Sequence, residues 1–359
     1  MSKTAVVNFE LFFIPPEDHF KTIMAEIPDD CDTVLCLLLA DGLLYKGPEF
    51  FEFFDLIKSK HPDKKFQLVV GMSGNDETIN FNFNLNETYQ SYTGATTYGW
   101  NSNSGKFLFL GGVPSRFNRI VLLKKFYEAG LLDRAEWSFF KPWTGDQEYW
   151  CRQALQDYTD EEYNKFLNDC ERKIDDVYES SKEYGTDPQK QTFDWCEDPA
   201  WINPEVYRNT TLSIISEGVP DNLNLDTHFL TEKTWRVFVQ RHPFLLAGTP
   251  DMMDYIKYLG LRTFEKYMAI PDYAYIENEF EKYDAIVKNT EQFLKDCHKY
   301  REEIDQDIDY NYYRFMQLAD DNKDVLYRVQ NYFNLDQETV DYWFNQKGFA
   351  HLLRMPNAK

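Results

Sequence analysis

The chain has 359 residues, is 43% hydrophobic and carries a formal net charge of −22. This length gives room for two domains of about 150 residues each, and the strong negative charge disfavours a basic nucleic-acid binder or a protein that binds anionic membranes. The six cysteines include no CxxC pair, which argues against a zinc site or a disulfide framework and predicts a reducing, cytoplasmic location.

Short apolar segments separated by turns dominate the first hundred residues. Residues 5–9, 33–39 and 66–71 are rich in apolar and β-branched side chains, which predicts buried strands. Residues 50–58 have the apolar spacing of a helix and precede the last of these strands. Strands that alternate with a helix indicate an α/β fold with a parallel sheet. The polar stretch 72–104 is the expected domain boundary.

A second α/β unit is predicted to start at residue 106. Its expected elements, in chain order, are a strand at 107–110, a tight turn at Gly111-Gly112, an amphipathic helix at 119–129 and a strand at 137–140. Residues 158–185 are expected to form a separate helix, because Thr159 and Glu162 have the spacing of a capping box. We interpret 150–200 as a helical insertion.

The α/β pattern resumes beyond residue 210. The expected elements are strands at 211–216, 243–247 and 261–264, and helices at 232–241, 250–259 and 276–304. The acidic and aromatic tail beyond residue 300 is predicted to be helical. The fold class predicted from this order is α/β, with a helical insertion and a helical C-terminal tail.

Two arginines follow the glycines at the end of the 107–110 strand. Glycine lets a backbone approach a ligand closely, and Arg116 and Arg119 have the guanidinium geometry that binds phosphate oxygens. The alternative interpretation is a strand-to-helix turn with arginines that face solvent.

A second candidate site lies where the 232–241 helix begins, at Thr231-Glu232-Lys233. Free N–H groups and the helix dipole make a helix N-terminus a suitable phosphate site. Ser216 and Glu217 close the preceding strand, at the sheet edge where α/β proteins bind ligands. The alternative is a helix cap with two surface charges. The nearby His242-Pro243 is expected to be structural.

Common catalytic motifs are absent from the sequence. It contains no GxGxxG, GxxxxGK[ST], HExxH or GxSxG pattern. Hydride transfer on a dinucleotide fold, P-loop chemistry and the common hydrolase mechanisms therefore lose support.

The two candidate segments together resemble GT-B-type nucleotide-sugar glycosyltransferases of phages and bacteria. Residues 107–140 resemble the strand, Arg-x-x-Arg helix and "GLLD" unit of that family. The order Ser216-Glu217, "TEK" at 231–233, "HPF" at 242–244, Gly248 and "LGLRTF" at 259–264 resembles its donor-binding half. The "TEK" helix start is also similar, more distantly, to that of alpha-1,3-fucosyltransferases, in which its glutamate and lysine hold the ribose and pyrophosphate of the donor.

The resemblance implies two Rossmann-like domains that face a cleft. Residues 1–103 would form the acceptor-side domain, 104–300 the donor-binding domain, and 301–359 a helical tail. The donor-binding residues would be Arg116, Arg119, Ser216, Glu217, Thr231, Glu232, Lys233 and Gly248. The reaction would invert the sugar, use neither metal nor cofactor, and need a carboxylate base, for which Asp41 and Asp76 are candidates. Each of these aspartates is equally typical of a turn.

The expected partners are a nucleotide-diphosphate sugar and an acceptor hydroxyl on a glycan or, by the phage connection, on a modified DNA base. No membrane span is expected, and the location would be the cytoplasm, or the host cytoplasm for a viral protein. Two alternatives remain open: a non-catalytic relative that binds sugar nucleotides, and an acidic module that binds other proteins through its helices at 158–185 and 276–347.

Overall fold

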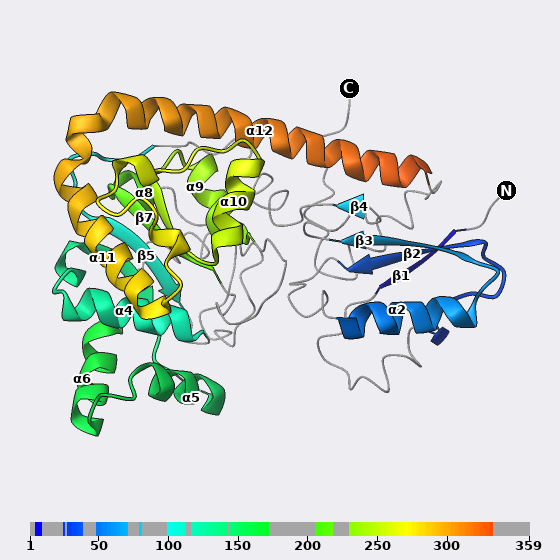
Figure 1. Cartoon of the computed structure of the whole chain (residues 1–359), viewed down its shortest axis with the longest axis horizontal. Helices are drawn as coiled ribbons and strands as arrows, with labels where there is room; N and C mark the ends of the chain where they lie inside the picture. The colour runs from blue at the N-terminus through cyan, green and yellow to red at the C-terminus, as the bar shows by residue number, and fades with distance from the viewer. Residues whose placement is uncertain are drawn as a thin grey trace, which may run out of the picture. The chain divides into compact units, whose positions relative to one another are not determined.

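The computed structural model describes residues 4–8, 24–25, 27–38, 48–70, 79–80, 99–112, 116–142, 144–171, 205–217 and 230–332. The chain divides into two compact units. The first comprises Met1–Gln90, Leu225–Phe229 and Gln317–Lys359, and the second comprises Ser91–Asn224 and Leu230–Met316. Each unit contains a four-stranded sheet (Figure 1) whose strands pair in parallel. The predicted α/β class with parallel sheets is therefore confirmed.

The first unit is built on a sheet of strand order β1-β2-β3-β4. Its elements are β1 (Thr4–Asn8), β2 (Thr33–Leu38), α2 (Pro48–Lys60), β3 (Lys65–Val70) and β4 (Ile79–Asn80). The ring of Phe54 on α2 meets the ring of Phe66 on β3 edge to face, with centroids 6.2 Å apart. The ammonium of Lys64 donates to the carbonyls of Asp29 and Cys31, at 2.8 Å each, which fixes the approach to β2 and β3.

The second unit is built on a sheet of strand order β6-β5-β7-β8. Its strands are β5 (Phe107–Gly112), β6 (Ala135–Phe139), β7 (Leu212–Ser216) and β8 (Phe244–Ala247). The chain leaves β5 towards β6 through helix α4 (Phe117–Glu128), and it leaves β7 in the opposite direction, towards β8, through helix α9 (Glu232–Val239). Right-handed crossovers place these two helices on opposite faces of the sheet. The carboxyl ends of β5 and β7 therefore form the switch point at which open parallel sheets bind ligands.

Further helices belong to this unit (Figure 1): α8 (Glu205–Arg208), α10 (Pro250–Tyr258), α11 (Glu279–Asp296) and the part of α12 (Arg301–Tyr332) up to Met316. Helix α11 packs against α4 and against β7 and β8. Aromatic rings fill the core, and the ring of Phe126 on α4 lies 4.6 Å from that of Phe107 and 5.9 Å from that of Phe109. Of the helices that the structure describes, none combines the length and the apolar character needed to cross a bilayer.

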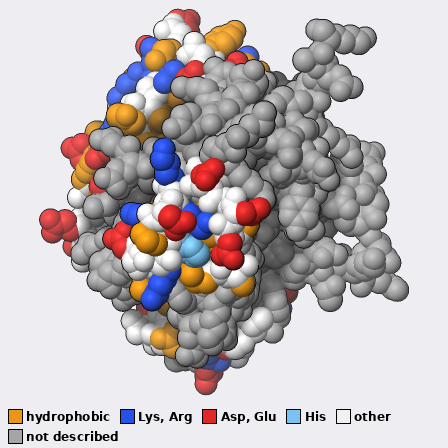
Figure 2. All heavy atoms as spheres, turned by 90° about the vertical axis from the view of Figure 1, so that its right-hand side faces the viewer, with side chains coloured by type: hydrophobic (Ala, Val, Ile, Leu, Met, Phe, Trp, Pro, Cys, Tyr) orange, Lys and Arg blue, Asp and Glu red, His pale blue; other side chains and the backbone are white. Residues whose placement is uncertain are grey.

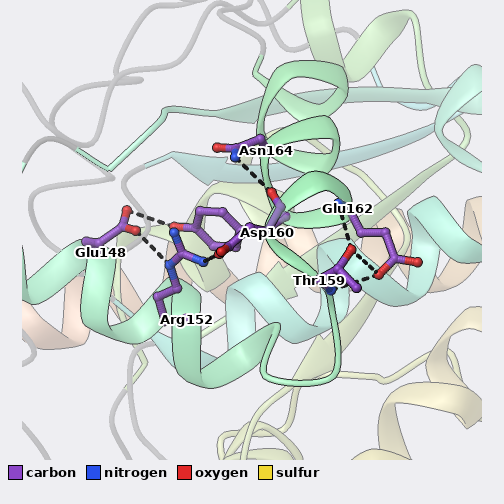
Figure 3. A network of polar contacts seen from close by, with 7 residues as sticks. Glu148, Arg152, Thr159, Asp160, Glu162 and Asn164 are labelled. Atoms are coloured by element: carbon purple, nitrogen blue, oxygen red, sulfur yellow. Dashed lines mark hydrogen bonds and ion pairs between the residues drawn. The ribbon is translucent and has the colours of Figure 1, made fainter.

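The described part of the predicted 150–200 insertion is residues 150–171, which contain the end of helix α5 (Gly145–Ala154) and the whole of helix α6 (Asp160–Cys170). The capping box is confirmed, since Thr159 Oγ1 accepts from the backbone N–H of Glu162 at 3.3 Å and the Glu162 carboxylate accepts from the N–H of Thr159 at 2.8 Å. Arg152 joins the two helices by pairing with Glu148 at 2.9 Å and with Asp160 at 2.6 Å (Figure 3). The rest of the predicted 158–185 helix lies outside the described residues.

The predicted tight turn at Gly111-Gly112 is wrong, because β5 continues through both glycines with a register shift against β6. A Cβ on Gly111 would lie 3.0 Å from the carbonyl oxygen of Ser138 on β6. The glycine thus serves the close approach of two strands rather than a turn.

The predicted strand at 261–264 is also wrong. The backbone N–H of Arg262 donates to Asn311 Oδ1 at 2.7 Å, and the Arg262 carbonyl accepts from Asn311 Nδ2 at 2.8 Å. A side chain of α12 therefore satisfies backbone groups that a neighbouring strand would otherwise pair. The predicted helix at 276–304 is divided by a 3₁₀ turn at Cys297–Tyr300 into the end of α11 and the start of α12.

Candidate functional site

The N-terminus of α4 carries two arginines and no acidic residue in its first turn. Arg116 is the N-cap residue, and its exposed side chain makes no capping hydrogen bond. Arg119 follows within the first turn, and its Nε is buried with no hydrogen-bond partner in the described part of the chain. Cations at the positive end of a helix dipole are unfavourable, by about 0.3–1 kcal/mol each. This helix start is therefore suited to receive an anion.

The guanidinium of Arg119 lies among charges from both helix starts. Burial lowers its pKa below the ordinary value, the charges of Glu217 and Glu232 raise the pKa, and the charge of Arg116 lowers it further. An arginine remains protonated at neutral pH in spite of such effects. Arg119 is therefore a partly desolvated cation that interacts with residues at the ends of β7 and at the start of α9.

A network of ion pairs connects the first turn of α9 to its last turn. The Glu232 carboxylate accepts from the ammonium of Lys233 at 2.8 Å and pairs with Arg236 at 3.2 Å. Burial raises the pKa of Glu232, but the charges of Lys233 and Arg236 outweigh this effect and lower the pKa to about 2. Thr231 is the N-cap, and its Oγ1 accepts from the N–H of Lys233 at 3.3 Å. Glu232 is therefore ionised at all physiological pH values.

The side chain of Glu217 points at the start of α9 and is fully buried. Its carboxylate accepts from the N–H of Thr231 at 3.0 Å, from the Thr231 hydroxyl at 2.6 Å and from the Thr234 hydroxyl at 2.5 Å. Its backbone carbonyl accepts from Asn118 Nδ2, on α4, at 2.8 Å. Glu217 thus connects the end of β7 to the starts of both helices.

Ser216 and Gly248 complete the carboxyl edge of the sheet. Ser216 lies opposite Ala247 in the pairing of β7 with β8, and its buried hydroxyl has no partner in the described ranges. Gly248 follows β8 directly, and a Cβ there would lie 2.7 Å from Met252 Sδ. The carbonyl of Gly248 accepts from the ammonium of Lys282, a buried residue of α11, at 3.5 Å. Both residues therefore lie at the end of the sheet where the two helices begin.

His242 has a structural environment at the opposite end of β8. The residue is 2% exposed, and its Nε2 lies 3.1 Å from the carbonyl oxygens of Tyr207 and Thr210. Its Nδ1 lies 2.9 Å from the hydroxyl of Ser213. A neutral ring satisfies these groups when Nε2 donates to a carbonyl and Nδ1 accepts from the serine. Burial lowers the pKa of His242 to about 4, although the carbonyls favour the protonated ring.

Most of the candidate residues from the sequence are thus found at one sheet edge. The two helix starts bring together Arg116, Arg119, Glu217, Thr231, Glu232 and Lys233, and the adjoining strand ends supply Ser216 and Gly248. Asp41 and Asp76 lie outside the described residues. Sequence reasoning missed Asn118, Thr234 and Arg236. The helical spacing from Thr231 to Thr234, and from Glu232 to Arg236, was the available signal.

No protein-family model matches this sequence, and no curated protein matches it significantly. The likeness to GT-B glycosyltransferases therefore depends on the sequence motifs. Within the described ranges, no cluster of three or more His, Cys, Asp or Glu side chains has an arrangement that would hold a metal ion.

Proposed function

We propose that this chain is a GT-B-type glycosyltransferase that binds the diphosphate of a nucleotide-sugar donor between the starts of α4 and α9. The observation that carries the proposal is the pair of arginines at the positive end of α4, one of which has a buried Nε with no hydrogen-bond partner among the residues that the structure describes. They lie beside the switch point between β5 and β7, where ligands of open parallel sheets bind.

The local charge balance supports a diphosphate ligand. The chain has a net charge of −22, yet the two helix starts and the end of β7 combine three cations (Arg116, Arg119 and Lys233) with two carboxylates (Glu217 and Glu232). Three positive and two negative charges leave a surplus of one positive charge. This surplus and the free helix N–H groups favour an anionic ligand such as a diphosphate.

The proposed reaction needs charge stabilisation on the leaving group. The acceptor hydroxyl oxygen forms a bond to C1 of the sugar, the bond from C1 to the phosphate oxygen breaks, and the nucleoside diphosphate leaves with the electron pair. The acceptor proton passes to a carboxylate base. Arg116, Arg119 and Lys233 would neutralise the charge that develops on the diphosphate, and Glu232 would accept hydrogen bonds from the ribose hydroxyls.

The proposal keeps the GT-B arrangement, in which residues 104–300 bind the donor and residues 1–103 contribute acceptor contacts. Asp41 and Asp76 remain candidate bases. For the acceptor, a glycan is favoured over a modified DNA base. The net charge of −22 disfavours the continuous basic surfaces through which duplex DNA is bound. Figure 2 shows acidic and basic side chains interspersed among the described residues of one face.

The proposal is tested by thermal unfolding with UDP, GDP and their sugar conjugates, without added metal. A ligand present at about 100 times its dissociation constant stabilises the folded state by about 2.7 kcal/mol. Arg116→Ala should abolish this stabilisation. It should also leave the ligand-free protein as stable as the wild type or more stable by about 0.3–1 kcal/mol, because it removes a cation from the positive end of a helix.

Lys125→Ala is the matched control. Lys125 lies in the last turn of the same helix, where a cation is favourable, and it pairs with Asp284 at 2.7 Å. Its removal should reduce stability without affecting ligand binding. If no nucleoside diphosphate or nucleotide sugar stabilises the wild type, the proposed function is wrong, and an acidic protein-binding module becomes the better hypothesis.

A further inference from the structure

Glu217 uses each of its hydrogen-bonding groups to hold a different element. Its N–H donates to the carbonyl of Ala247, on β8, at 3.2 Å. Its carbonyl accepts from Asn118 of α4, and its carboxylate accepts three hydrogen bonds from Thr231 and Thr234 of α9. These are the three elements that carry Arg119, Lys233 and the chain preceding Gly248. A single fully buried residue therefore sets the relative positions of the parts of the candidate site.

The contacts of Glu217 extend directly to the cations of that site. The hydroxyl of Thr231 donates to the Glu217 carboxylate at 2.6 Å and lies 3.3 Å from the ammonium of Lys233. The carboxylate also interacts with the guanidinium of Arg119 through its charge. Because the carboxylate already accepts three hydrogen bonds and has no exposed surface, it is not available to bind a sugar.

We propose that Glu217 is a positioning residue, an internal anion that fixes the first turn of α9 and aims Lys233 and Arg119 at the donor diphosphate. This inference deepens the proposed function and rests on it for its ligand. It assigns to Glu217 a task different from that of lining the sugar pocket, since the carboxylate acts through the residues that it holds.

Replacement of the carboxylate by an amide separates two effects of opposite sign. Glu217→Gln removes a negative charge next to the diphosphate site. If Glu217 acted only through its charge, the variant protein would bind a diphosphate more tightly than the wild type. If Glu217 is a positioning residue, the variant should instead bind a diphosphate more weakly. Loss of charge-assisted hydrogen bonds that order the site should weaken binding about tenfold or more.

The experiment measures the dissociation constant of UDP and GDP by calorimetry, together with hydrogen exchange of the α9 amides, at a temperature at which every variant is folded. Glu217→Gln should raise the dissociation constant and speed exchange at Thr231. Thr234→Val removes one donor to the carboxylate, keeps the charge, and should change both quantities in the same direction. It also provides a milder variant if Glu217→Gln does not fold.

Asp307→Asn is the matched control. Asp307 is a buried carboxylate of α12 that accepts from Tyr267 and pairs with Arg262, both at 2.8 Å, outside the candidate site. The Asp307→Asn substitution should lower the melting temperature and leave the UDP and GDP dissociation constants unchanged. Equal or tighter binding by Glu217→Gln overturns the inference.

Different measurements test the proposed function and the positioning role of Glu217: nucleotide binding by the wild type tests the first, and amide exchange in the variants tests the second. If the wild type binds neither UDP nor GDP, the glycosyltransferase proposal fails, and the exchange measurement still decides whether Glu217 orders α9. Unchanged exchange at Thr231 in both Glu217→Gln and Thr234→Val contradicts the positioning role whatever the ligand.

Discussion

The burial of His242 makes folding sensitive to mild acid. The pKa of this ring is lowered from 6.5 to about 4 because burial near the start of β8 disfavours the charged form, and this effect outweighs the carbonyl groups that favour the protonated ring. The folded state holds the neutral ring, and the unfolded chain binds a proton below pH 6.5. The stability from this residue is therefore complete above pH 6.5 and is lost as the pH falls towards 4.

The size of this effect on the free energy of unfolding follows from the linkage between proton binding and folding. A fall in pKa from 6.5 to about 4 corresponds to a total of about 3 kcal/mol, of which about 2 kcal/mol is lost between about pH 7.5 and about pH 5. The assay is urea unfolding of the wild type and of His242→Gln at both pH values. Since other titrating groups affect both proteins equally, the variant should lose about 2 kcal/mol less than the wild type over this interval. Equal losses in the two proteins would show that the folded state does not hold His242 as a neutral ring with a lowered pKa.

Two further predictions concern helix ends. Thr159→Ala removes the side-chain half of the capping box of α6, in which Thr159 Oγ1 accepts from the N–H of Glu162, and urea unfolding should show a loss of about 1 kcal/mol; a loss below about 0.3 kcal/mol would mean that the cap is not a stabilising feature. Gly260→Ala places a Cβ on a residue with φ +77°, 3.2 Å from Arg314 Nε, and should cost about 1–2 kcal/mol. Gly145→Ala, where a Cβ meets nothing within 4 Å, is its control and should be neutral or slightly stabilising.

The periodicity of apolar residues predicted the sheet elements well, because each β-α unit is encoded locally. Strands β5, β6, β7 and β8 and helices α4, α9 and α10 lie within a few residues of their predicted positions. The errors arose where contacts between distant residues decide the structure. Leu261–Phe264 has the apolar pattern of a strand, yet Asn311 of α12 binds its backbone from 49 positions further along the chain. No local pattern reveals such a contact.

In the candidate site, too, the features with a local sequence pattern were predicted, and the contacts between distant residues were not. Arg116, Arg119 and the start of α9 were found because turns and helix caps have local signatures. The approach of α4 to α9 was implied only indirectly, by the rule that parallel strands end at one edge. The partners of Glu217 were not foreseeable, since its bonds to Asn118 and Thr231 depend on how β5 and β7 are paired.

Hydrogen exchange of the whole chain, with and without saturating UDP or GDP, tests whether the donor binds between the starts of α4 and α9. We predict slower exchange at the starts of α4 and α9, within residues 116–121 and 231–236, and no change in α5 and α6. Bound nucleotide that leaves both helix starts unchanged, or protects only α5 and α6, would contradict the assignment of the site.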